Sequence, residues 1–301
     1  MARERGMARR LYIAALFLTM LIWAGSFIAI KIALRELSPF NLAFYRFLIA
    51  TPLMLIACRN LRLPELKDLP NIVVLALTGV TLLYAVQFLA LKLTTATNAS
   101  ILINTCAIFI ALMSYILLGE RFTGLKVAGI IVSFVGVVMI ISNGFNAGFS
   151  GQTALGDVLM VFDGLLWAIY TVLGKRLLEK YGAGALTAYA FAAGTFLLLP
   201  FALYEGIEDI FSLTPQAWAS LLYLSVLCSV FAYVVWYAAL SHMDATEVAV
   251  FVYLVPLFTA IMAVFLLGEE ITPFIAVGGV LTIAGVYMVE QYSFRHTENL
   301  K

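Results

Sequence analysis

The sequence predicts an all-α integral membrane protein with ten transmembrane helices, arranged as two inverted five-helix repeats. Of its 301 residues, 63% are hydrophobic and only 12% are charged, whereas soluble domains carry about 25% charged residues. The mean hydropathy is +1.03. The charged residues separate apolar runs that are close to the ~20 residues a helix needs to cross a bilayer core. In addition, the two halves of the chain resemble each other.

Ten apolar runs can be marked along the chain, and each is long enough for a membrane-spanning helix. Strands of a membrane barrel would be about half as long and would alternate apolar with polar residues. Helices are therefore the spanning structure that satisfies every backbone group in lipid. The ten runs are residues 11–31, 40–58, 71–91, 96–118, 124–142, 155–174, 185–204, 216–238, 246–267 and 272–291.

The first run follows a group of arginines, as the apolar core of a cleavable signal peptide also does. Such a core usually has about 7 to 15 residues. The run at 11–31 is longer than that. We therefore interpret it as a retained first helix.

The positive charges predict the orientation. Most of the 18 Lys and Arg residues fall on the side of the N-terminus when the runs are taken as crossings. The other side holds only Lys31, Arg35 and Lys92, and Arg46 lies inside the second run. Loops rich in Lys and Arg stay in the cytoplasm. We expect a multi-pass protein of the cell (inner or plasma) membrane with both termini in the cytoplasm.

An internal repeat relates the two halves. LIWAGSFIAIK at 21–31 matches LLWAIYTVLGK at 165–175, at an offset of 144 residues. Further along, ATNASILINTCAIFIALMSYILLGE from Ala96 matches ATEVAVFVYLVPLFTAIMAVFLLGE from Ala245, at an offset of 149 residues. The change of offset falls in the connection before the third or the eighth predicted helix.

The repeat divides the chain into residues 1–148 and 149–301, with five predicted helices in each. An odd number of crossings turns the second copy upside down relative to the first. Residues 143–154 would then face the outside and residues 176–184 the cytoplasm. Inverted repeats are an architecture for alternating access, in which a shared site opens first to one side and then to the other. This arrangement predicts a carrier.

Several motifs extend over both repeats. They are LIWAGSF and SPFNLAFYRF in the first, and LPFAL, LYLSVLCSVFAYVVWYAALSHMDATEVAVFVYLVPLF, LLGEEIT and GGVLTIAGVYMV in the second. In combination they resemble the EamA-type carriers of the drug/metabolite transporter superfamily, over nearly the whole chain. The resemblance implies ten helices, a central cavity between the halves, and often the export of amino acids or related metabolites.

Polar and aromatic residues in the middle of the runs are the candidates for a substrate site, because lipid gives them no reason to be there. They recur at helical spacing on one face of the first and sixth helices, and in matched places on the third and eighth and on the fourth and ninth. Buried rings and amides also serve packing between helices. Their occurrence on matched helices favours a cavity whose rings form walls and whose polar groups orient a ligand. The candidate substrate-binding residues are Trp23, Ser26, Tyr84, Gln87, Asn104, Asp163, Trp167, Tyr170, Tyr233, Trp236 and Tyr253.

Asp163 is the deepest carboxylate of the predicted helices. At that depth a carboxylate is paired, protonated or in contact with water. Three partners stay open for it: Arg46, an amine of the substrate, or a coupling proton. Arg46 stands about seven residues into its run and is otherwise expected to extend outward to the interface.

Three glutamates and a proline in or beside the predicted helices are interpreted as structural residues. Glu247 stands at a helix start, where the helix dipole favours a negative charge. Glu120 and Glu269 end the matched LLGE segments, which indicates a turn or a gate more than a ligand contact. Pro256 lies inside the ninth helix where its repeat mate is Ala107, so we expect a kink in one repeat only, which would make the two gates unequal.

No catalytic site, metal site or cofactor is predicted. The sequence has no G-x-x-x-x-G-K-[ST] loop for ATP hydrolysis. His242 and His296 fall in a short loop and in the tail, and the three cysteines are too far apart for a disulfide framework or a metal site. A net charge of +1 gives no reason to expect a nucleic-acid partner.

The predicted function is secondary transport of small metabolites by alternating access, with export of amino acids or related compounds. The alternatives are a channel or a lipid scramblase and, with less support, an intramembrane enzyme. The expected partners are a small-molecule substrate and the lipid bilayer. Coupling to a proton or another ion stays open, as does the choice between a monomer and a weak oligomer.

Overall fold

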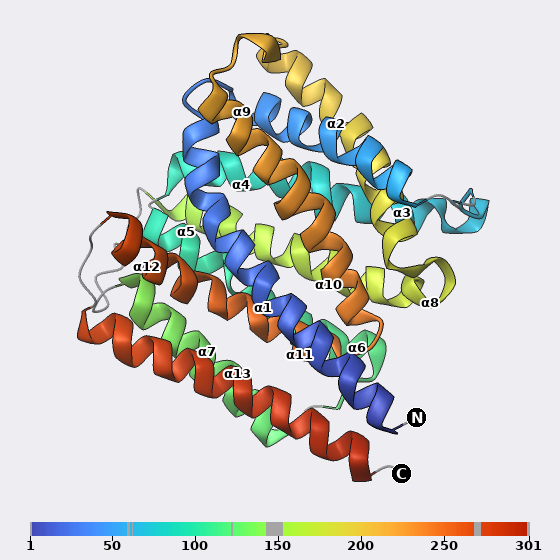
Figure 1. Ribbon diagram of the computed structural model, residues 1–301, viewed down its shortest axis with the longest axis vertical. Helices are drawn as coiled ribbons and strands as arrows, with labels where there is room; N and C mark the ends of the chain where they lie inside the picture. Colours follow the sequence, from blue (N-terminus) through green and yellow to red (C-terminus); the bar gives the residue numbers. More distant parts are fainter. Residues whose placement is uncertain are drawn as a thin grey trace. The chain divides into compact units, whose positions relative to one another are not determined.

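The computed structural model describes residues 2–58, 61, 63–94, 96–121, 123–142, 153–267 and 272–299. Within these residues the regular structure is helical and contains no strand, as the sequence predicts (Figure 1). The α-helices are α1 (Ala2–Ala33), α2 (Pro39–Ala57), α3 (Leu69–Ala76), α4 (Leu82–Leu93), α5 (Ala96–Ile103), α6 (Cys106–Leu118), α7 (Gly124–Ser142), α8 (Ala154–Glu205), α9 (Pro215–Leu222), α10 (Ala232–Leu240), α11 (Ala245–Val250), α12 (Leu254–Leu267) and α13 (Pro273–Asn299).

Nine helical stretches of the described residues are long and apolar enough to cross a membrane. One of them, α8, has 52 residues. A straight helix of that length would measure about 78 Å, more than twice the ~30 Å of a bilayer core. Inside α8, Gly182 has φ 73° and ψ 163°, a backbone conformation essentially restricted to glycine. The α8 stretch is therefore two helical segments that meet at Gly182.

The connection predicted between the sixth and seventh helices is wrong in its length, because only Gly182 leaves helical geometry. Polar contacts stabilise the helical turn that precedes Gly182. Lys180 Nζ lies 2.7 Å from Glu65 Oε2, and the Tyr181 hydroxyl donates to Asp68 Oδ2 over 2.5 Å. The hydrogen bond from Lys180 also holds the pKa of the Glu65 carboxyl below its ordinary value. These contacts let the helix continue where the sequence suggests a polar loop.

The predicted ninth helix is interrupted by a 3-10 turn, Phe251–Tyr253, between α11 and α12. Pro256 follows the turn and has no N–H to donate to the carbonyl of Val252, four residues earlier. The tighter winding of a 3-10 turn accommodates the missing bond. The interruption thus lies shortly before the proline from which the sequence predicts a kink.

The predicted fourth helix is interrupted as well, at Asn104 and Thr105, between α5 and α6. The 149-residue offset aligns Asn104 with Tyr253, so the two interruptions occupy matched places. Here the Thr105 hydroxyl donates to the Leu102 carbonyl over 2.6 Å, a local bond that competes with the helix ladder. Each repeat therefore has an interruption at this place, and only the one in the second repeat is followed by a proline.

Two segments wind as π-helix. They are Leu77–Thr81, between α3 and α4, and Tyr223–Phe231, between α9 and α10. The 149-residue offset maps residues 77–81 onto 226–230, so the wide turns occupy matched places in the two repeats. π-helical turns are rare and frequently stand at functional sites.

Close contacts divide the chain into two compact units. The first consists of Met1–Phe88 and Ile169–His242, and the second of Leu89–Ala168 and Met243–Lys301. Each unit contains segments from both sequence repeats.

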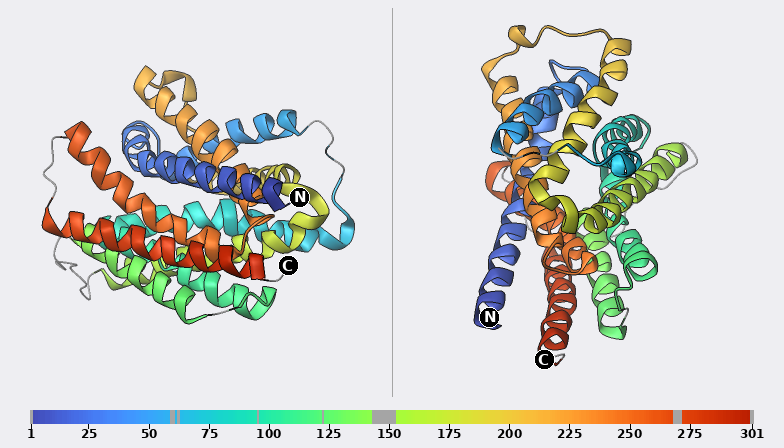
Figure 2. Two further views of the ribbon diagram at one scale, coloured as in Figure 1. Left: turned by 60° about the horizontal axis from the view of Figure 1, so that its bottom comes forward. Right: turned by 90° about the vertical axis from the view of Figure 1, so that its right-hand side faces the viewer.

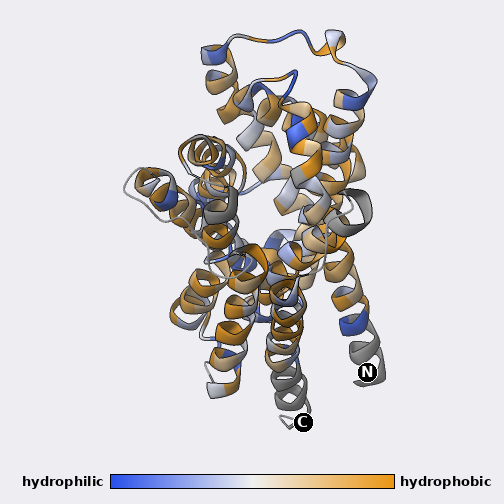
Figure 3. Cartoon of the chain, turned by 90° about the vertical axis from the view of Figure 1, so that its left-hand side faces the viewer, coloured by the Kyte–Doolittle hydropathy of each residue, from blue (hydrophilic) through white to orange (hydrophobic). Residues whose placement is uncertain are grey.

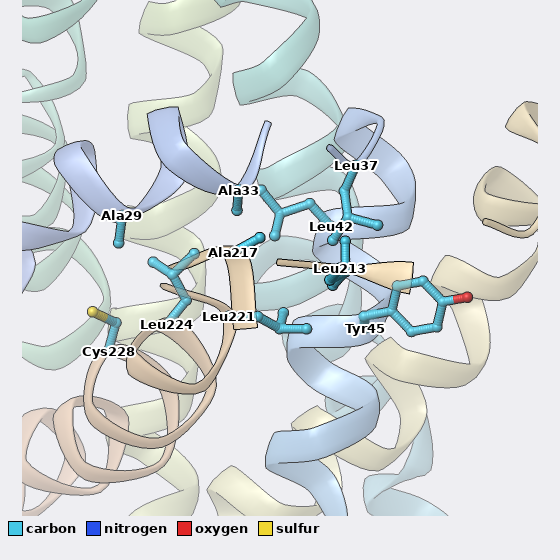
Figure 4. Packing of buried hydrophobic residues seen from close by; sticks show 10 residues of the cluster. All are labelled: Ala29, Ala33, Leu37, Leu42, Tyr45, Leu213, Ala217, Leu221, Leu224 and Cys228. Carbon is cyan, nitrogen blue, oxygen red and sulfur yellow. The ribbon is translucent and has the colours of Figure 1, made fainter. Parts of the chain in front are cut away.

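The core of the first unit forms where α1, α2 and α9 meet the second π-helical segment. Small side chains such as Ala29 and Ala33 stand on the side of α1 that faces this core, which allows the helices to approach closely (Figure 4). The buried cluster consists of Ala29, Ala33, Leu37, Leu42, Tyr45, Leu213, Ala217, Leu221, Leu224 and Cys228.

In the second unit α7 and α13 pack side by side over most of their length (Figures 1 and 2). Glycines make the close approach possible. A Cβ atom on Gly129 would lie 2.7 Å from the carbonyl oxygen of Gly285, and one on Gly136 would lie 2.6 Å from that of Gly278. Gly129 meets the later glycine of α13 and Gly136 the earlier one, so the two helices are antiparallel.

Glu120 follows α6 and is bonded to the start of α11. Its Oε1 accepts from the Ala245 N–H over 2.6 Å, and its Oε2 accepts from the N–H and the hydroxyl of Thr246 over 3.2 and 2.9 Å. Glu247 stands in the first turn of the same helix, where the dipole favours a negative charge. Glu269, the repeat mate of Glu120, lies outside the described residues.

Large apolar side chains are exposed on the helices. Figure 3 shows hydrophobic residues along most of the helical surface and hydrophilic residues at several connections. Exposed apolar surface on this scale is costly in water and favourable in lipid. Examples are Ile56, Ile116, Val158, Phe196 and Val280.

Candidate functional site

The π-helical segments of the first unit place backbone carbonyls within reach of polar side chains. The Tyr233 hydroxyl donates to the Gly79 carbonyl over 2.9 Å. The indole N–H of Trp23 donates to the Cys228 carbonyl over 3.1 Å, and Nη2 of Arg46 lies 3.4 Å from the same oxygen. A buried carbonyl without a partner is costly, so these side chains stabilise the wide turns.

Aromatic rings gather around this point. The ring centroids of Trp23 and Trp236 are 5.6 Å apart, and those of Phe191 and Tyr233 are 5.1 Å apart. The ring of Tyr170 stacks on that of Tyr237 in α10, with the centroids 4.8 Å apart. Edge-to-face and stacked pairs at these distances are favourable beyond the area they bury. We call the following set the aromatic cluster: Trp23, Phe47, Tyr84, Tyr170, Phe191, Tyr233, Trp236 and Tyr237.

Arg46 is buried beside the aromatic cluster and does not extend outward as the sequence suggests. Its side chain comes from the middle of α2, and the residue is 4% exposed. The guanidinium donates from Nε to the Ser229 hydroxyl over 2.7 Å. Its carbon Cζ lies 4.6 Å from the ring centroid of Tyr84 and 5.4 Å from that of Phe47, which is cation–π geometry.

Repeat mates touch each other in the first unit. Phe47 and Phe191, related by the 144-residue offset, have ring centroids 5.0 Å apart. The hydroxyls of Thr51 and Thr195, related by the same offset, share a hydrogen bond of 2.8 Å. Those of Tyr84 and Tyr233, related by the 149-residue offset, share one of 3.2 Å. Residues that contact their own mates lie close to an axis that relates the two copies.

The first unit brings together five of the predicted site residues: Trp23, Tyr84, Tyr170, Tyr233 and Trp236. All but Trp23 are fully or nearly fully buried.

Two further candidates belong to the first unit. The Ser26 hydroxyl donates to the carbonyl of Trp23 over 2.6 Å, a bond within its own helix. Gln87 is half-buried on α4.

The remaining candidates belong to the second unit. Asn104 stands at the interruption between α5 and α6, and Tyr253 at the one before α12. Asp163 and Trp167 lie on α8, and the Asp163 side chain is 0% exposed. All four are buried.

A groove of 410 Å³ lies on the second unit. Apart from Asp157 its lining is apolar, and none of the predicted site residues lines it. The lining residues are Leu102, Phe109, Asp157, Val158, Val161, Phe162 and Leu165.

The described residues contain no group of three or more His, Cys, Asp and Glu side chains that could hold a metal ion. Cys58, Cys106 and Cys228 are free thiols in this part of the chain. The aromatic cluster supplies rings, tyrosine hydroxyls and two indole N–H groups, and the guanidinium of Arg46 lies beside it. This combination suits the binding and orientation of an organic molecule.

Sequence reasoning missed Phe47, Phe191 and Tyr237 as members of the aromatic cluster, and Arg46 and Ser229 as the polar residues beside it. The signal was available, because the 144-residue offset also holds in the second and seventh predicted helices. There it aligns Phe47 with Phe191, and it aligns Arg46 with Ala190.

Comparison with known proteins agrees with the fold and the repeat. The model of the EamA-like transporter family matches the chain twice, over residues 10–142 and 154–290. One solved crystal structure has a TM-score of 0.81 to this chain at 20% sequence identity. The match covers 95% of this chain and 98% of the chain in that structure. That similarity supports the fold alone.

Two curated relatives are similar over nearly their whole length. A protein of Archaeoglobus fulgidus described as an uncharacterized transporter is 59% identical over 91% of this chain and 95% of its own. A probable terminal-alkyne amino-acid exporter of Streptantibioticus cattleyicolor is 32% identical over 92% of each. Together with the two family matches, these relatives confirm the resemblance read from the sequence motifs: the chain belongs to the EamA-like transporter family and is a multi-pass membrane transporter.

Proposed function

We propose that this transporter is a secondary carrier that works by alternating access, with ten crossings in two inverted repeats. The observation that carries the proposal is the contact between repeat mates in the first unit, Phe47 with Phe191 and Tyr84 with Tyr233. When the two copies exchange conformations, side chains close to the axis that relates them can move from one environment into its equivalent. The break at Gly182 supports ten crossings, because it divides the 52 residues of α8 into two.

The packing in the second unit supports the inversion. There Ser133 donates its hydroxyl to the carbonyl of Thr282, its mate at the 149-residue offset, over 3.2 Å. The helices that carry these mates, α7 and α13, are antiparallel, as the glycine contacts require. Antiparallel packing of equivalent helices is expected of copies with opposite orientations in the membrane.

Topology can be tested with single cysteines in a variant in which Cys58, Cys106 and Cys228 are alanine. In intact cells a membrane-impermeant maleimide should label Asn146→Cys. It should label Glu179→Cys only after the membrane is opened, because the positive charges hold that side in the cytoplasm. The cysteine-free parent sets the background. Labelling of both positions from the same side would rule out the inverted arrangement.

We further propose that the substrates are amino acids or related small metabolites and that the direction is export. The description of the Streptantibioticus relative as a probable terminal-alkyne amino-acid exporter supports this. The aromatic cluster supplies apolar walls and a few polar groups, as sites for small organic molecules do. Asp163 is the proposed contact for a substrate amine or a coupling proton, because a carboxylate at that depth is rarely retained without a function.

The proposed activity can be measured with the purified full chain in liposomes, against amino acids, nucleosides, sugar phosphates and amines. We expect saturable uptake and counterflow for at least one amino acid or related compound. Trp23→Ala should weaken its binding by about 1 to 2 kcal/mol, because an aromatic wall of the proposed site is removed. Trp218, half-buried on α9, supplies the matched control Trp218→Ala.

Two outcomes would contradict this proposal. Flux that rises linearly with concentration and shows no counterflow would indicate a channel, and movement of labelled lipid between leaflets would indicate a scramblase. If Trp23→Ala lowers the folded yield while the affinity of the surviving protein is unchanged, Trp23 serves packing rather than binding.

A further inference from the structure

Arg46 is a cation in the middle of a membrane-spanning helix, away from both ends of α2. An arginine at this depth is costly and is usually paired or functional. A guanidinium in a protein carries its positive charge, so the surroundings of this side chain have to offset the cost. The cost of removing this side chain from water is usually offset by a paired negative charge.

The partners of Arg46 in the first unit are neutral. They are the Ser229 hydroxyl, the Cys228 carbonyl and the rings of Tyr84 and Phe47. Among the described residues of this unit, no carboxylate forms an ion pair with it. A guanidinium has five N–H donors, and the two hydrogen bonds engage Nε and Nη2. Nη1 has no hydrogen-bond partner in the described part of the unit.

The repeat indicates that the packing does not require an arginine. The 144-residue offset aligns Arg46 with Ala190. The neighbouring pairs around it are identical, Phe47 with Phe191 and Thr51 with Thr195. The matched position of the other copy is buried and holds only a methyl group. The cation is therefore present in one copy and absent from the other.

We propose that Arg46 binds the carboxylate of the transported substrate. Cζ of the guanidinium lies over the Tyr84 ring, and its hydrogen bonds in this unit come from Nε and Nη2. The Nη1 donors are therefore the ones to meet a planar carboxylate, which a guanidinium binds in a bidentate manner. The surrounding rings suit the organic part of such a molecule better than a free inorganic anion. This assignment rests on the proposed carrier function, whose opening and closing would give a substrate access to a buried cation.

The test uses acids and the matching amides, in which an uncharged carboxamide replaces the carboxylate, as probes on the purified full chain. The pairs are L-phenylalanine with L-phenylalaninamide, L-leucine with L-leucinamide, and 3-phenylpropionate with 3-phenylpropionamide, with inorganic phosphate and chloride as free anions. The unfolding temperature and the dissociation constant are measured for each. At least one acid should stabilise the wild type while its amide does not. Arg46→Gln should weaken binding of that acid by about thirtyfold or more, since a charge-paired contact is lost.

Two variants separate binding from folding. Arg46→Lys keeps the charge and should retain part of the response to acids, although it loses the planar fork. Arg35→Gln removes an exposed cation of the same unit and should respond as the wild type does. If Arg46→Gln does not fold, the comparison of acid with amide in the wild type and in Arg46→Lys still decides the question.

The inference is overturned if no acid stabilises the wild type, if acid and amide act alike, or if the response to an acid persists in Arg46→Gln. It is also overturned if phosphate or chloride protects as well as the organic acids do. Binding of acids without transport in liposomes would remove the carrier function and keep the anion site. Transport of amines alone would keep the carrier and remove the anion site.

Discussion

Replacing Gly136 with leucine should prevent most of the protein from folding. A Cβ atom there would lie 2.5 Å from Thr282 Oγ1 and 2.6 Å from the carbonyl oxygen of Gly278. The second neighbour is backbone, so α7 and α13 would have to separate. Overpacking of this kind costs about 3 kcal/mol or more, a large share of the stability of most proteins. Folded yield in detergent and the unfolding temperature measure the effect.

Gly124 provides the matched control for this substitution. It is the first residue of the same helix, and a Cβ atom on it would meet nothing within 4 Å. Gly124→Leu should therefore fold like the wild type. If Gly136→Leu also folds with an unchanged unfolding temperature, the close contact between α7 and α13 is not required for stability.

Replacing Glu120 with alanine should produce the second large loss. The carboxylate accepts three hydrogen bonds at the start of α11, from Ala245 and Thr246. Without it these donors would be left buried and unsatisfied, at about 1 to 3 kcal/mol each. We expect the free energy of unfolding to fall by about 3 to 5 kcal/mol. Chemical unfolding of the purified protein would measure this.

A graded series distinguishes the charge from the shape of Glu120. Glu120→Gln retains an acceptor oxygen but loses the charge and should be intermediate, since charge-assisted bonds are roughly twice as strong as neutral ones. Glu179→Ala, at an exposed position of α8, should have little effect. Equal stability of the alanine variant and the wild type would show that the start of α11 does not depend on this carboxylate.

The architecture could be predicted from the sequence because lipid imposes simple rules. Each crossing must be helical and about 20 residues long, and the internal match supplied the symmetry. The same match indicated Tyr84 and Tyr233 as related positions, and their hydroxyls share a hydrogen bond in the first unit. It also paired Trp23 with Trp167, but these two belong to different units, so the contact of Trp23 with Tyr233 was not indicated by the repeat.

The interruptions in the helices could not be predicted in the same way. Only Pro256 carries a signal that is specific for a break. The break at Asn104 comes from a threonine hydroxyl that bonds its own backbone, and threonine is common inside helices. The end of the first segment of α8 depends on Gly182, and glycine is frequent in membrane helices without breaking them. Each case was decided by backbone bonds that sequence alone does not specify.

Arg46 shows a different limit. A sequence rule about depth predicts that a long cationic side chain reaches the interface. The structure instead buries it, because the π-helical segment presents a carbonyl and a serine hydroxyl at the right place, and Tyr84 covers the guanidinium. The rule failed because it considers the distance to water and not the polar groups of a neighbouring helix.

The two π-helical segments also give their helices a means of rotation. A π-helical turn contains one residue more than the α-helical turn that it replaces. If that turn migrates along the helix, the stretch it passes rotates by about 100° about the helix axis, because one residue of an α-helix corresponds to that angle. The ladder of backbone bonds is preserved on either side. Tyr84 and Tyr233 stand on the stretches that follow the two segments. Both side chains could therefore be turned toward new neighbours without unfolding either helix.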